Sequence, residues 1–472
     1  MPLAMPVPAA LVALALALAS GQGSAPAGGR MLEAGPGRAY AGAVQALAAA
    51  RPGDTVRLMP GRHPGPLVAR IPRVTMTGPR AAVVDGGRRG TVITVVADSV
   101  TLDGFTVSAS GRSMDRDDAA VKLEHCVGCT LRGLAVRDPL HGIYLLESDG
   151  VTIEGNDIVG AADLTESARG NGIHLFNSTG NRLLRNRVRA TRDGIYFSFA
   201  SGNLVADNEV SRARYGLHYM YSDDNRFEGN VFAENAAGAA IMFSKRIVLR
   251  RNLFARHIGY RAYGLLLQTG EDILAEGNRF EANLTALFLD GSLRNTFRDN
   301  LIAGNGTGID LLASAEQNTF TENVFRHNRT PVRKVLGTGE NAWSLDGRGN
   351  DWGDPAVFDL DRDGIGDRPY RAGDPFLALA ASRPALEVYG GTLAAHALSW
   401  AEEAFPVFGV PRVVDSAPLA PRRPAASAIG GTLSAAEGLG RAMVPPALAA
   451  MLTLAILGQR YRRRRAGKGA PQ

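Results

Sequence analysis

A repeat of about 22 residues limits the folds available to this chain of 472 residues. A four-residue unit, Gly or Ala followed by an apolar residue, any residue and another apolar residue, recurs at spacings of 30, 22, 22, 24, 24, 22 and 22 residues. The units begin at Gly142, Gly172, Gly194, Gly216, Ala240, Gly264, Ala286 and Gly308. Self-similarity with this period is typical of stacked repeats in which each unit packs against its neighbours.

Two asparagine-led segments recur in phase with this unit. One begins at Asn186, Asn208 and Asn230, and the other about five residues earlier, at Asn181 and Asn203. Three short apolar-alternating segments per period, separated by Gly, Asn and Asp, indicate three strands and three turns per coil. We therefore predict an all-β fold, a right-handed parallel β-helix of roughly eleven coils about 4.8 Å apart. The stacked asparagines are expected to exchange amide hydrogen bonds between coils.

The repeat divides the chain into expected segments. The β-helix with its N-terminal cap is expected over residues 31–330, and residues 40–50 have the composition of a capping helix. Residues 331–417 form an Asp- and Trp-rich, partly helical C-terminal extension, and residues 418–440 form a Pro/Ala/Ser linker.

The N-terminal segment predicts export. Residues 1–29 carry no charged side chain, and residues 9–19 form an apolar run of the length found in signal peptides. We therefore expect residues 1–29 to be a signal peptide and the body of the protein to lie outside the cytoplasm.

The formal net charge of +6 is located at the C-terminus. Residues 441–472 contain seven Lys or Arg residues and no acid, so subtracting them leaves −1 for the rest of the chain. A nucleic-acid partner is therefore not expected. Residues 442–458 are apolar, and seventeen helical residues reach roughly 25 Å. Residues 441–472 are thus interpreted as an inner-membrane anchor with a basic cytoplasmic tail, and an amphipathic or disordered tail remains the alternative.

Outward-facing positions of the repeat predict a chemically distinctive face. The third residues of the units are Tyr144, His174, Tyr196, His218, Met242, Leu266, Phe288 and Asp310, and Phe176, Ser198, Met220 and Ser244 lie two residues further along. We expect His218, Met220 and Met242 to converge, with His174 two coils below. Imidazole and thioether donors form a soft set that suits Cu(I).

The same face has a second interpretation as an apolar and aromatic docking surface for another protein. Tyr144, Phe176 and Tyr196 would belong to it, because Met and Tyr are common at interfaces. Docking and metal binding can coexist on one face.

The two cysteines, Cys126 and Cys129, form a CxxC motif. In an oxidising compartment such a pair is a disulfide, a soft-metal site, or one core cysteine beside one turn cysteine. The alignment of Cys129 with Val100 and Val151 favours a structural role.

A second local motif consists of Asp359, Asp361, Asp363 and Asp367, with Gly364 among them. It matches the first half of an EF-hand loop, but Tyr370 stands at the twelfth position in place of Glu, which excludes a complete EF-hand. A calcium-tied loop and a plain Asp/Gly turn cluster both remain open.

A carbohydrate-binding or carbohydrate-processing β-helix, such as a polysaccharide lyase or epimerase, is the rival functional class. It would need paired carboxylates with a Lys or Arg on one face. The acids and the lysine available are Asp138, Asp193, Asp223, Asp224 and Lys245. Because the outward positions carry aromatic, His and Met side chains instead, we do not expect an enzyme.

Four stretches of the chain resemble the NosD family: residues 192–210 (RDGIYFSFASGNLVADNEV), 215–230 (YGLHYMYSDDNRFEGN), 350–370 (NDWGDPAVFDLDRDGIGDRPY) and 413–419 (VVDSAPL). The resemblance covers roughly residues 31–419. It implies a periplasmic, non-catalytic β-helix protein that assists assembly of the copper-sulfide centre of nitrous oxide reductase. The partners it implies are an ABC transporter permease and ATPase, a copper chaperone and the reductase itself. The resemblance assigns no copper ligand, so the residues proposed above depend on spacing alone.

Overall fold

The computed structural model describes residues 29–421 apart from 258, 260–261, 313, 335–339, 354–356, 373–375, 377–383, 390–391 and 405–412. The signal peptide up to residue 28, the membrane anchor and nearly all of the linker lie outside the described residues, so these predictions are untested. Within the described part of the chain, no helix has both the length and the apolar character needed to cross a membrane.

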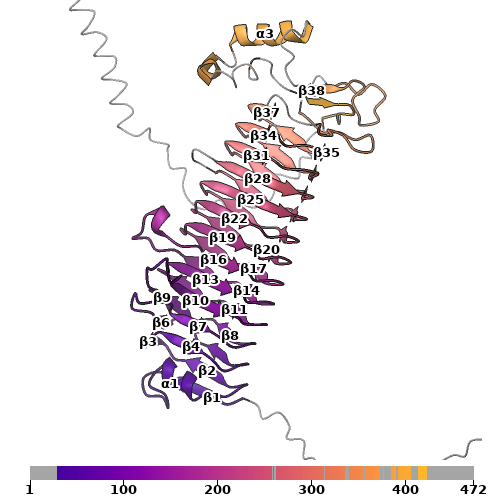
Figure 1. The fold of residues 1–472 in the computed structure, drawn as a ribbon. Helices are drawn as coiled ribbons and strands as arrows, with labels where there is room; N and C mark the ends of the chain where they lie inside the picture. Colours follow the sequence, from indigo (N-terminus) through magenta and orange to yellow (C-terminus); the bar gives the residue numbers. More distant parts are fainter. Residues whose placement is uncertain are drawn as a thin grey trace, which may run out of the picture. The chain divides into compact units, whose positions relative to one another are not determined.

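Three parallel sheets form the walls of a β-helix (Figure 1), and they contain 13, 12 and 12 strands. Sheet A consists of β1 (Met31–Ala34), β2 (Thr55–Leu58), β5 (Thr75–Thr77), β8 (Thr101–Asp103), β11 (Thr130–Arg132), β14 (Thr152–Glu154), β17 (Arg182–Leu184), β20 (Leu204–Ala206), β23 (Arg226–Glu228), β26 (Val248–Arg250), β29 (Leu274–Glu276), β32 (Thr296–Arg298) and β35 (Thr319–Thr321). Sheet B consists of β3 (Gly61–Pro64), β6 (Ala82–Asp85), β9 (Thr106–Ser108), β12 (Ala135–Arg137), β15 (Asp157–Val159), β18 (Arg187–Arg189), β21 (Glu209–Ser211), β24 (Val231–Ala233), β27 (Leu253–Ala255), β30 (Arg279–Glu281), β33 (Leu301–Ala303) and β36 (Val324–Arg326).

Sheet C consists of β4 (Leu67–Ala69), β7 (Ile93–Val95), β10 (Ala119–Glu124), β13 (His141–Leu146), β16 (Ile173–Phe176), β19 (Asp193–Ser198), β22 (Tyr215–Met220), β25 (Ala237–Lys245), β28 (Tyr263–Glu271), β31 (Thr285–Asp290), β34 (Thr307–Leu311) and β37 (Thr330–Lys334). The remaining elements are α1 (Ala43–Ala48), η1 (Glu166–Ala168), β38 (Tyr370–Ala372), η2 (Pro384–Tyr389), α3 (Leu393–Ala404) and β39 (Val413–Asp415). The predicted parallel β-helix is confirmed. The expected eleven coils were too few, because the first coils lack the Gly and Asn signatures of the later ones.

The interior of the β-helix is filled by apolar side chains that stack from coil to coil. Phe232, Phe254 and Phe280 lie at equivalent positions of sheet B, and their ring centroids are 5.3 and 5.0 Å apart. All three side chains are fully buried. Because strand residues alternate between the two faces, this inward stack leaves the neighbouring residues of each strand facing outward.

Asparagine ladders run along the turns, as predicted. The longest described ladder contains Asn156, Asn186, Asn208, Asn230, Asn252, Asn278, Asn300, Asn323 and Asn350. In each step the Oδ1 of one asparagine accepts hydrogen bonds from the backbone N–H and the side-chain amide of the preceding one, for example at 3.0 and 2.9 Å between Asn208 and Asn230. These bonds satisfy polar groups that are buried at the turns.

The ladders continue past residue 330. Asn341 and Asn350 accept hydrogen bonds from Asn318 and Asn323, and Trp343 and Trp352 stack on the last core phenylalanines. The buried carboxylate of Asp415, in β39, accepts hydrogen bonds from the backbone N–H of Asn350 at 2.7 Å and from Trp352 Nε1 at 2.9 Å. A residue 65 positions away in sequence therefore accepts the hydrogen bonds of polar groups in the final coil.

Candidate functional site

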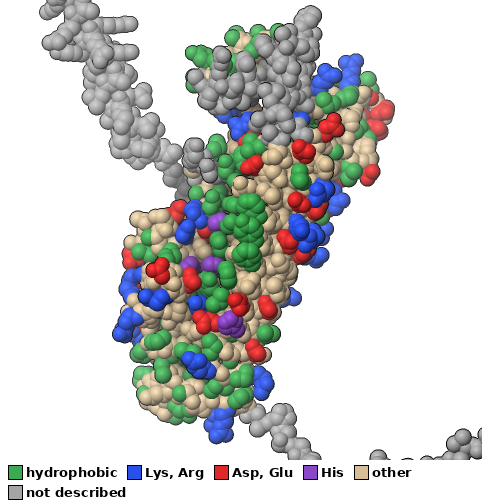
Figure 2. Space-filling model, viewed as in Figure 1, with side chains coloured by type: hydrophobic (Ala, Val, Ile, Leu, Met, Phe, Trp, Pro, Cys, Tyr) green, Lys and Arg blue, Asp and Glu red, His purple; other side chains and the backbone are tan. Residues whose placement is uncertain are grey.

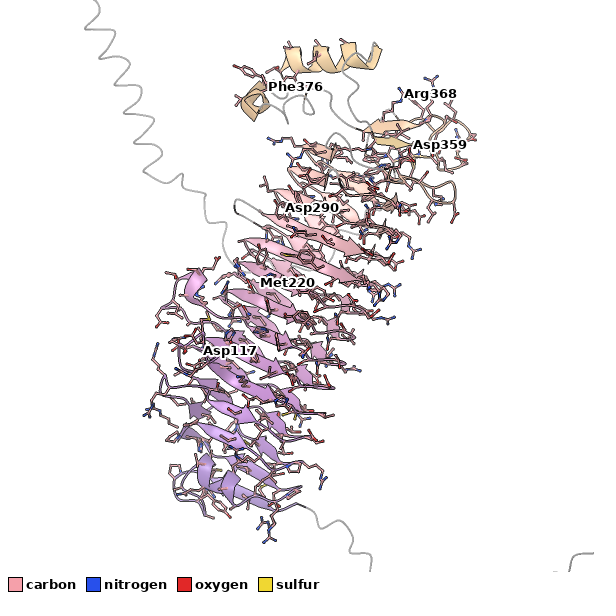
Figure 3. The ribbon with its side chains drawn as sticks, in the orientation of Figure 1. Asp117, Met220, Asp290, Asp359, Arg368 and Phe376 are labelled. Carbon is pink, nitrogen blue, oxygen red and sulfur yellow. The ribbon has the colours of Figure 1, made fainter. Side chains whose placement is uncertain are left out.

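The outer face of sheet C carries two parallel rows of side chains, set by the strand register. The first row is Lys122, Tyr144, His174, Tyr196, His218, Ala240, Leu266, Phe288 and Asp310. The second row is Glu124, Leu146, Phe176, Ser198, Met220, Met242, Gln268 and Asp290. Figure 3 labels Met220 and Asp290 of the second row.

Met242 lies in the second row, so its predicted place beside His218 in the first row was wrong. The register pairs His218 with Ala240 and Met220 with Met242. The physical reason is that the unit in register begins at Gly238, and Ala240 imitates the start of a repeat unit two residues late. Since the error is two residues, Met242 still faces outward. The two thioethers therefore lie on directly paired residues of neighbouring strands, and His218 precedes Met220 by two residues on the same face of β22.

His218 is held in a network of charged and aromatic groups. Its Nδ1 lies 2.9 Å from Oδ2 of Asp193, and Arg214 donates to both oxygens of that carboxylate at 2.9 and 2.7 Å. The side chain of Asp193 is 2% exposed and that of His218 is 14% exposed. Burial raises the pKa of Asp193, but the hydrogen bonds from His218 and Arg214 outweigh it and hold the pKa below its ordinary value. Asp193 is therefore a buried, ionised acceptor.

His174 lies in the first row but not in contact with the His218 group, because Tyr196 stands between them. Its ring centroid is 4.3 Å from that of Tyr144 and 4.5 Å from that of Tyr196. Among the described residues its buried Nε2 has no hydrogen-bond partner. Burial, followed by the influence of His141, holds the pKa of His174 well below 6.5, so the ring is neutral near pH 7.

His141 was missed by the sequence analysis. It is the first residue of β13, its ring centroid lies 5.7 Å from that of His174, and its Nδ1 accepts the backbone N–H of Asn171 at 3.1 Å. Burial lowers the pKa of His141 to about 4. No sequence signal distinguished it, because it lies one residue before the repeat unit used for alignment.

The exposed aromatic surface differs from the predicted one. Tyr144 is only 5% exposed, so its assignment to a partner surface was wrong. Three aromatic residues at equivalent positions, Phe199 and Tyr221 directly after β19 and β22 and Phe243 inside the longer β25, are 52%, 47% and 40% exposed. Their rings stack at centroid distances of 5.3 and 5.2 Å. We call these three residues the aromatic stripe; it borders Met220 and Met242. In Figure 2 apolar side chains form a band on this face beside histidines.

The aromatic stripe has a left-handed backbone conformation that its residue types do not predict. The φ values of Phe199, Tyr221 and Phe243 are +52°, +49° and +49°. Other coils place Glu147, Asn177, Thr269 and Gly291 in this left-handed turn position. Bulky residues are uncommon there, so three consecutive aromatic side chains indicate a role outside the turn itself.

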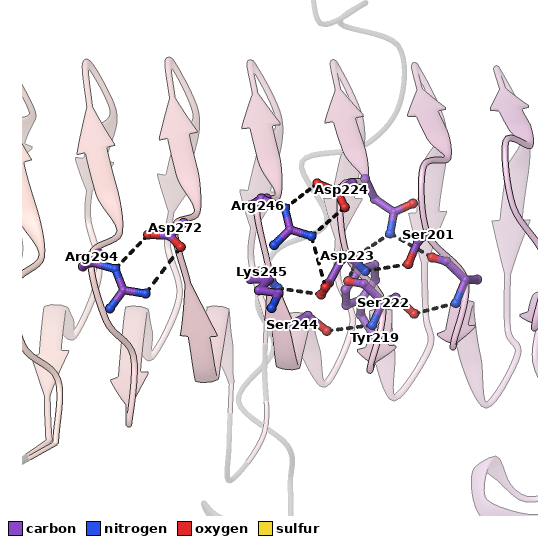
Figure 4. Close-up of polar contacts among 12 residues, drawn as sticks. Ser201, Tyr219, Ser222, Asp223, Asp224, Ser244, Lys245, Arg246, Asp272 and Arg294 are labelled. Atoms are coloured by element: carbon purple, nitrogen blue, oxygen red, sulfur yellow. Dashed lines mark hydrogen bonds and ion pairs between the residues drawn. The ribbon is translucent and has the colours of Figure 1, made fainter.

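The carboxylates of the rival enzymatic interpretation are each paired with arginine. Asp138 contacts Arg88 at 2.8 Å and also Arg112. Asp193 contacts Arg214, and Arg246 contacts both Asp223 and Asp224 at 3.3 and 2.7 Å, while the backbone N–H of Lys245 donates to Asp223 (Figure 4). Asp193 and the Asp223–Asp224 pair thus belong to separate ion pairs at different corners of the coil.

Both cysteines lie in the core. Cys126 and Cys129 are 0% and 1% exposed and are free thiols. Both lie in the connection between β10 and β11 with buried side chains, which agrees with the structural role favoured by the alignment. Cys126 Sγ lies 3.1 Å from the carbonyl oxygen of Val95, and Cys129 Sγ lies 3.3 Å from that of Ala97.

The aspartate loop is partly assembled. Oxygens of Asp359, Asp361 and Asp363 lie within 4.8 Å of one another. Asp367 instead accepts the backbone N–H of Leu360 at 2.8 Å. Asp361 and Asp363 are exposed, and hydrogen bonds within the loop also account for this geometry. Calcium binding stays a prediction.

Comparison with known proteins places the chain in a family. Residues 155–357 match the sequence model of the family described as "Periplasmic copper-binding protein (NosD)". A "Probable ABC transporter binding protein NosD" from Pseudomonas aeruginosa is 41% identical over 384 residues, which cover 78% of this chain and 88% of that protein. A protein of the same description from Stutzerimonas stutzeri is 38% identical and covers 77% and 86%.

Solved structures share the fold. The catalytic domain of a GH87 α-1,3-glucanase has a TM-score of 0.53 at 14% identity over 70% of each chain. The pre-mature gene product 12 of bacteriophage phi29 has a TM-score of 0.52 at 14% identity, over 64% of this chain and 49% of the other. At this level of identity only the architecture is shared. The two bacterial relatives, by contrast, are 41% and 38% identical over more than three quarters of this chain, and the chain therefore belongs to the NosD family.

Proposed function

We propose that this protein holds Cu(I) on the outer face of sheet C in the periplasm and takes part in assembling the copper-sulfide centre of nitrous oxide reductase. It would do so as the β-helix partner of an ABC transporter, with its permease and ATPase, and receive the metal from a copper chaperone. The family description and the names of the two bacterial relatives support the copper and transporter parts of this proposal.

One observation carries the proposal. Two thioethers, Met220 and Met242, lie on directly paired residues beside a histidine whose Nδ1 is already engaged. Thioether sulfur and neutral imidazole nitrogen are soft or borderline donors, which favour Cu(I) over Ca²⁺ or Mg²⁺. Both methionines are half-buried, so the metal would be partly shielded from water yet open to exchange.

The rival carbohydrate-active function has weaker support. General acid and base catalysis on a sugar requires a free carboxylate in each role. Asp138, Asp193, Asp223 and Asp224 are instead held by arginine side chains. The likeness to a glucanase domain at 14% identity concerns the fold alone.

Cu(I) affinity tests the proposal directly. Met220→Leu and Met242→Leu keep the side-chain volume but remove the sulfur, and His218→Ala removes the nitrogen. We expect each substitution to weaken Cu(I) binding at least about tenfold, equivalent to about 1.4 kcal/mol. The measurement is competition against a chromophoric Cu(I) chelator under anaerobic conditions.

Met114→Leu is the matched control for this titration. Met114 is 37% exposed and lies in the loop between β9 and β10, and β10 is four strands of sheet C away from β22, which carries His218 and Met220. Its affinity should equal that of the wild type. Wild-type affinity in all three site variants would remove copper binding from this face.

The aromatic stripe is proposed as the docking surface for the transporter. Exposed aromatic side chains at the centre of an interface often contribute 2 kcal/mol or more to binding, roughly a thirtyfold effect. Tyr221→Ser combined with Phe243→Ser should therefore abolish co-purification of the transporter subunits with this protein. Phe358→Ser is the control, because Phe358 is 65% exposed and lies in the extension. Equal recovery of the subunits with both variants would rule out docking at the stripe.

A further inference from the structure

We infer that Asp193 and Arg214 are positioning residues that fix the tautomer and orientation of His218, so that its Nε2 is the nitrogen presented to the metal. This inference rests on the proposed copper role and extends it to two residues that lie outside the donor set. Neither was selected by the sequence analysis for this purpose.

The tautomer follows from the hydrogen-bond inventory. The carboxylate of Asp193 is 2% exposed and takes two hydrogen bonds from Arg214, at 2.9 Å to Oδ1 and 2.7 Å to Oδ2. A carboxylate paired with a guanidinium is ionised and can only accept hydrogen bonds. Arg214 Nη2 lies 3.5 Å from His218 Nδ1, but the Asp193 Oδ2 contact at 2.9 Å is much shorter and therefore requires a proton on Nδ1. In a neutral imidazole this leaves the lone pair on Nε2.

The orientation follows from the strand register. Asp193 is paired with Tyr215, three residues before His218, whereas Met220 lies two residues after it with Met242 alongside. The two ring nitrogens point in widely different directions in the plane of the imidazole. With Nδ1 directed towards Asp193, Nε2 is directed away from it. Because Met220 follows His218 along β22 and Met242 is paired with Met220 on the next strand, we infer that Nε2 faces the thioethers.

Two tyrosines hold the plane of the ring. The His218 ring meets that of Tyr196 edge-on, at 4.9 Å and 85°, and lies 5.0 Å from the ring of Tyr215. Arg214 in turn lies over the Tyr215 ring at 4.9 Å. Arg214 thus contacts both the Asp193 carboxylate and the Tyr215 ring. Its positive charge also balances the negative charge of Asp193 beside the proposed metal site.

This arrangement is the one that metal-binding histidines commonly use. A carboxylate that receives the second ring N–H orients the ligand and raises its basicity, and loss of such a partner typically weakens metal binding 10- to 100-fold. A structural ion pair would not need a histidine at this distance.

The chain offers a matched control for the ion pair. Asp310 is in the first row, is 1% exposed, and accepts hydrogen bonds from Arg333 through both oxygens. Asp310→Asn therefore breaks a buried Asp–Arg pair on the same sheet, four coils from His218 and without involving it.

The experiment compares Asp193→Asn, Asp193→Glu and Asp310→Asn with wild type in the full chain. Cu(I) affinity is measured by chelator competition, and the tautomer of His218 in the metal-free protein by long-range ¹H–¹⁵N NMR of ¹⁵N-histidine-labelled samples, with His218→Ala identifying the resonance. We expect the wild type to carry its proton on Nδ1. Asp193→Asn should lose about 10- to 100-fold in affinity and show a mixed or reversed tautomer.

The controls separate positioning from stability. Asp193→Glu keeps an acceptor and should keep the Nδ1–H tautomer, even if thermal denaturation shows that Asp193→Asn folds poorly. Asp310→Asn should bind Cu(I) within about twofold of wild type. An Nε2–H tautomer in the wild type, or wild-type affinity in Asp193→Asn, would overturn the inference. Unchanged affinity in His218→Ala would instead overturn the proposed copper site, because the metal then does not use this histidine.

Discussion

Replacing Asn230 with alanine is expected to lower the free energy of unfolding by about 4 kcal/mol. Asn230 is fully buried, and its Oδ1 accepts from both the backbone N–H and the side-chain amide of Asn208. Its own Nδ2 donates to the carbonyl oxygen of Val205 and to Oδ1 of Asn252, each at 2.9 Å. Alanine removes all four hydrogen bonds, although Asn208 Nδ2 still donates to Leu183 O and Asn252 Oδ1 still accepts the backbone N–H of residue 230. A buried group left without a partner costs about 1–3 kcal/mol, and each other lost hydrogen bond costs about 1 kcal/mol. Urea denaturation of the full chain measures the change.

Asn181→Ala is the matched comparison. Asn181 is equally buried and its Oδ1 accepts the backbone N–H of Val151 at 2.8 Å, but its Nδ2 has no partner within the described structure. Its replacement should cost about 1–2 kcal/mol. Equal losses at the two positions would show that ladder hydrogen bonds do not determine the stability of the coils.

Acidification is expected to destabilise the β-helix between pH 6.5 and 4. Burial lowers the pKa of both His141 and His257 to about 4. In this interval the unfolded chain binds protons that the folded chain does not. The contribution of these neutral histidines to the free energy of unfolding is therefore fully present above about pH 6.5, and it decreases as the pH falls towards 4. One pKa unit corresponds to 1.36 kcal/mol, so each histidine contributes a loss of about 3 kcal/mol by pH 4. Urea midpoints measured from pH 7.5 to 4.5 would record it.

His257→Asn isolates one of the two contributions. His257 occupies a rung of an asparagine ladder between Asn235 and Asn283, with hydrogen bonds of 3.3 Å on both sides. Asparagine would restore the ladder and remove one titrating group. This variant should keep its stability at pH 7.5 and lose about 3 kcal/mol less than wild type on acidification. An unchanged pH dependence would exclude His257 as a source of the acid sensitivity.

Much of the fold was predictable because the residues that determine it recur within every coil. Asn208 and Asn230 indicate the ladder. Gly194 and Gly216 lie where the next coil approaches so closely that a Cβ atom would meet its backbone oxygen at 2.7 and 2.6 Å, respectively. Such requirements recur in each coil and therefore produce a periodic pattern in the amino-acid sequence. The closure of the last coil by Asp415 produces no such pattern, because it occurs once and joins residues far apart in sequence.

The site was only partly predictable. His218, Met220 and Met242 were found by spacing, and all three face outward. The register of Met242 was missed because Ala237–Ala240 offers two equivalent frames, and only the hydrogen-bonded pairing distinguishes them. Asp193 and Arg214 were not linked to His218, because their contacts depend on how the turns place side chains from neighbouring coils. The exposure of the aromatic stripe depended on left-handed turns that the residue types themselves disfavour.

Stacking of coils also gives the molecule a discrete set of lengths. Every paired strand adds one step of about 4.8 Å, so the separation between His218 and the tryptophans of the final coil can change only by whole steps. A deletion of one 22-residue coil between them, with the ladders rejoined, would move the donor face closer to that end by one such step. Evolution could thus adjust how far the donors lie from whatever is bound at that end by duplicating or losing coils, without redesigning either surface.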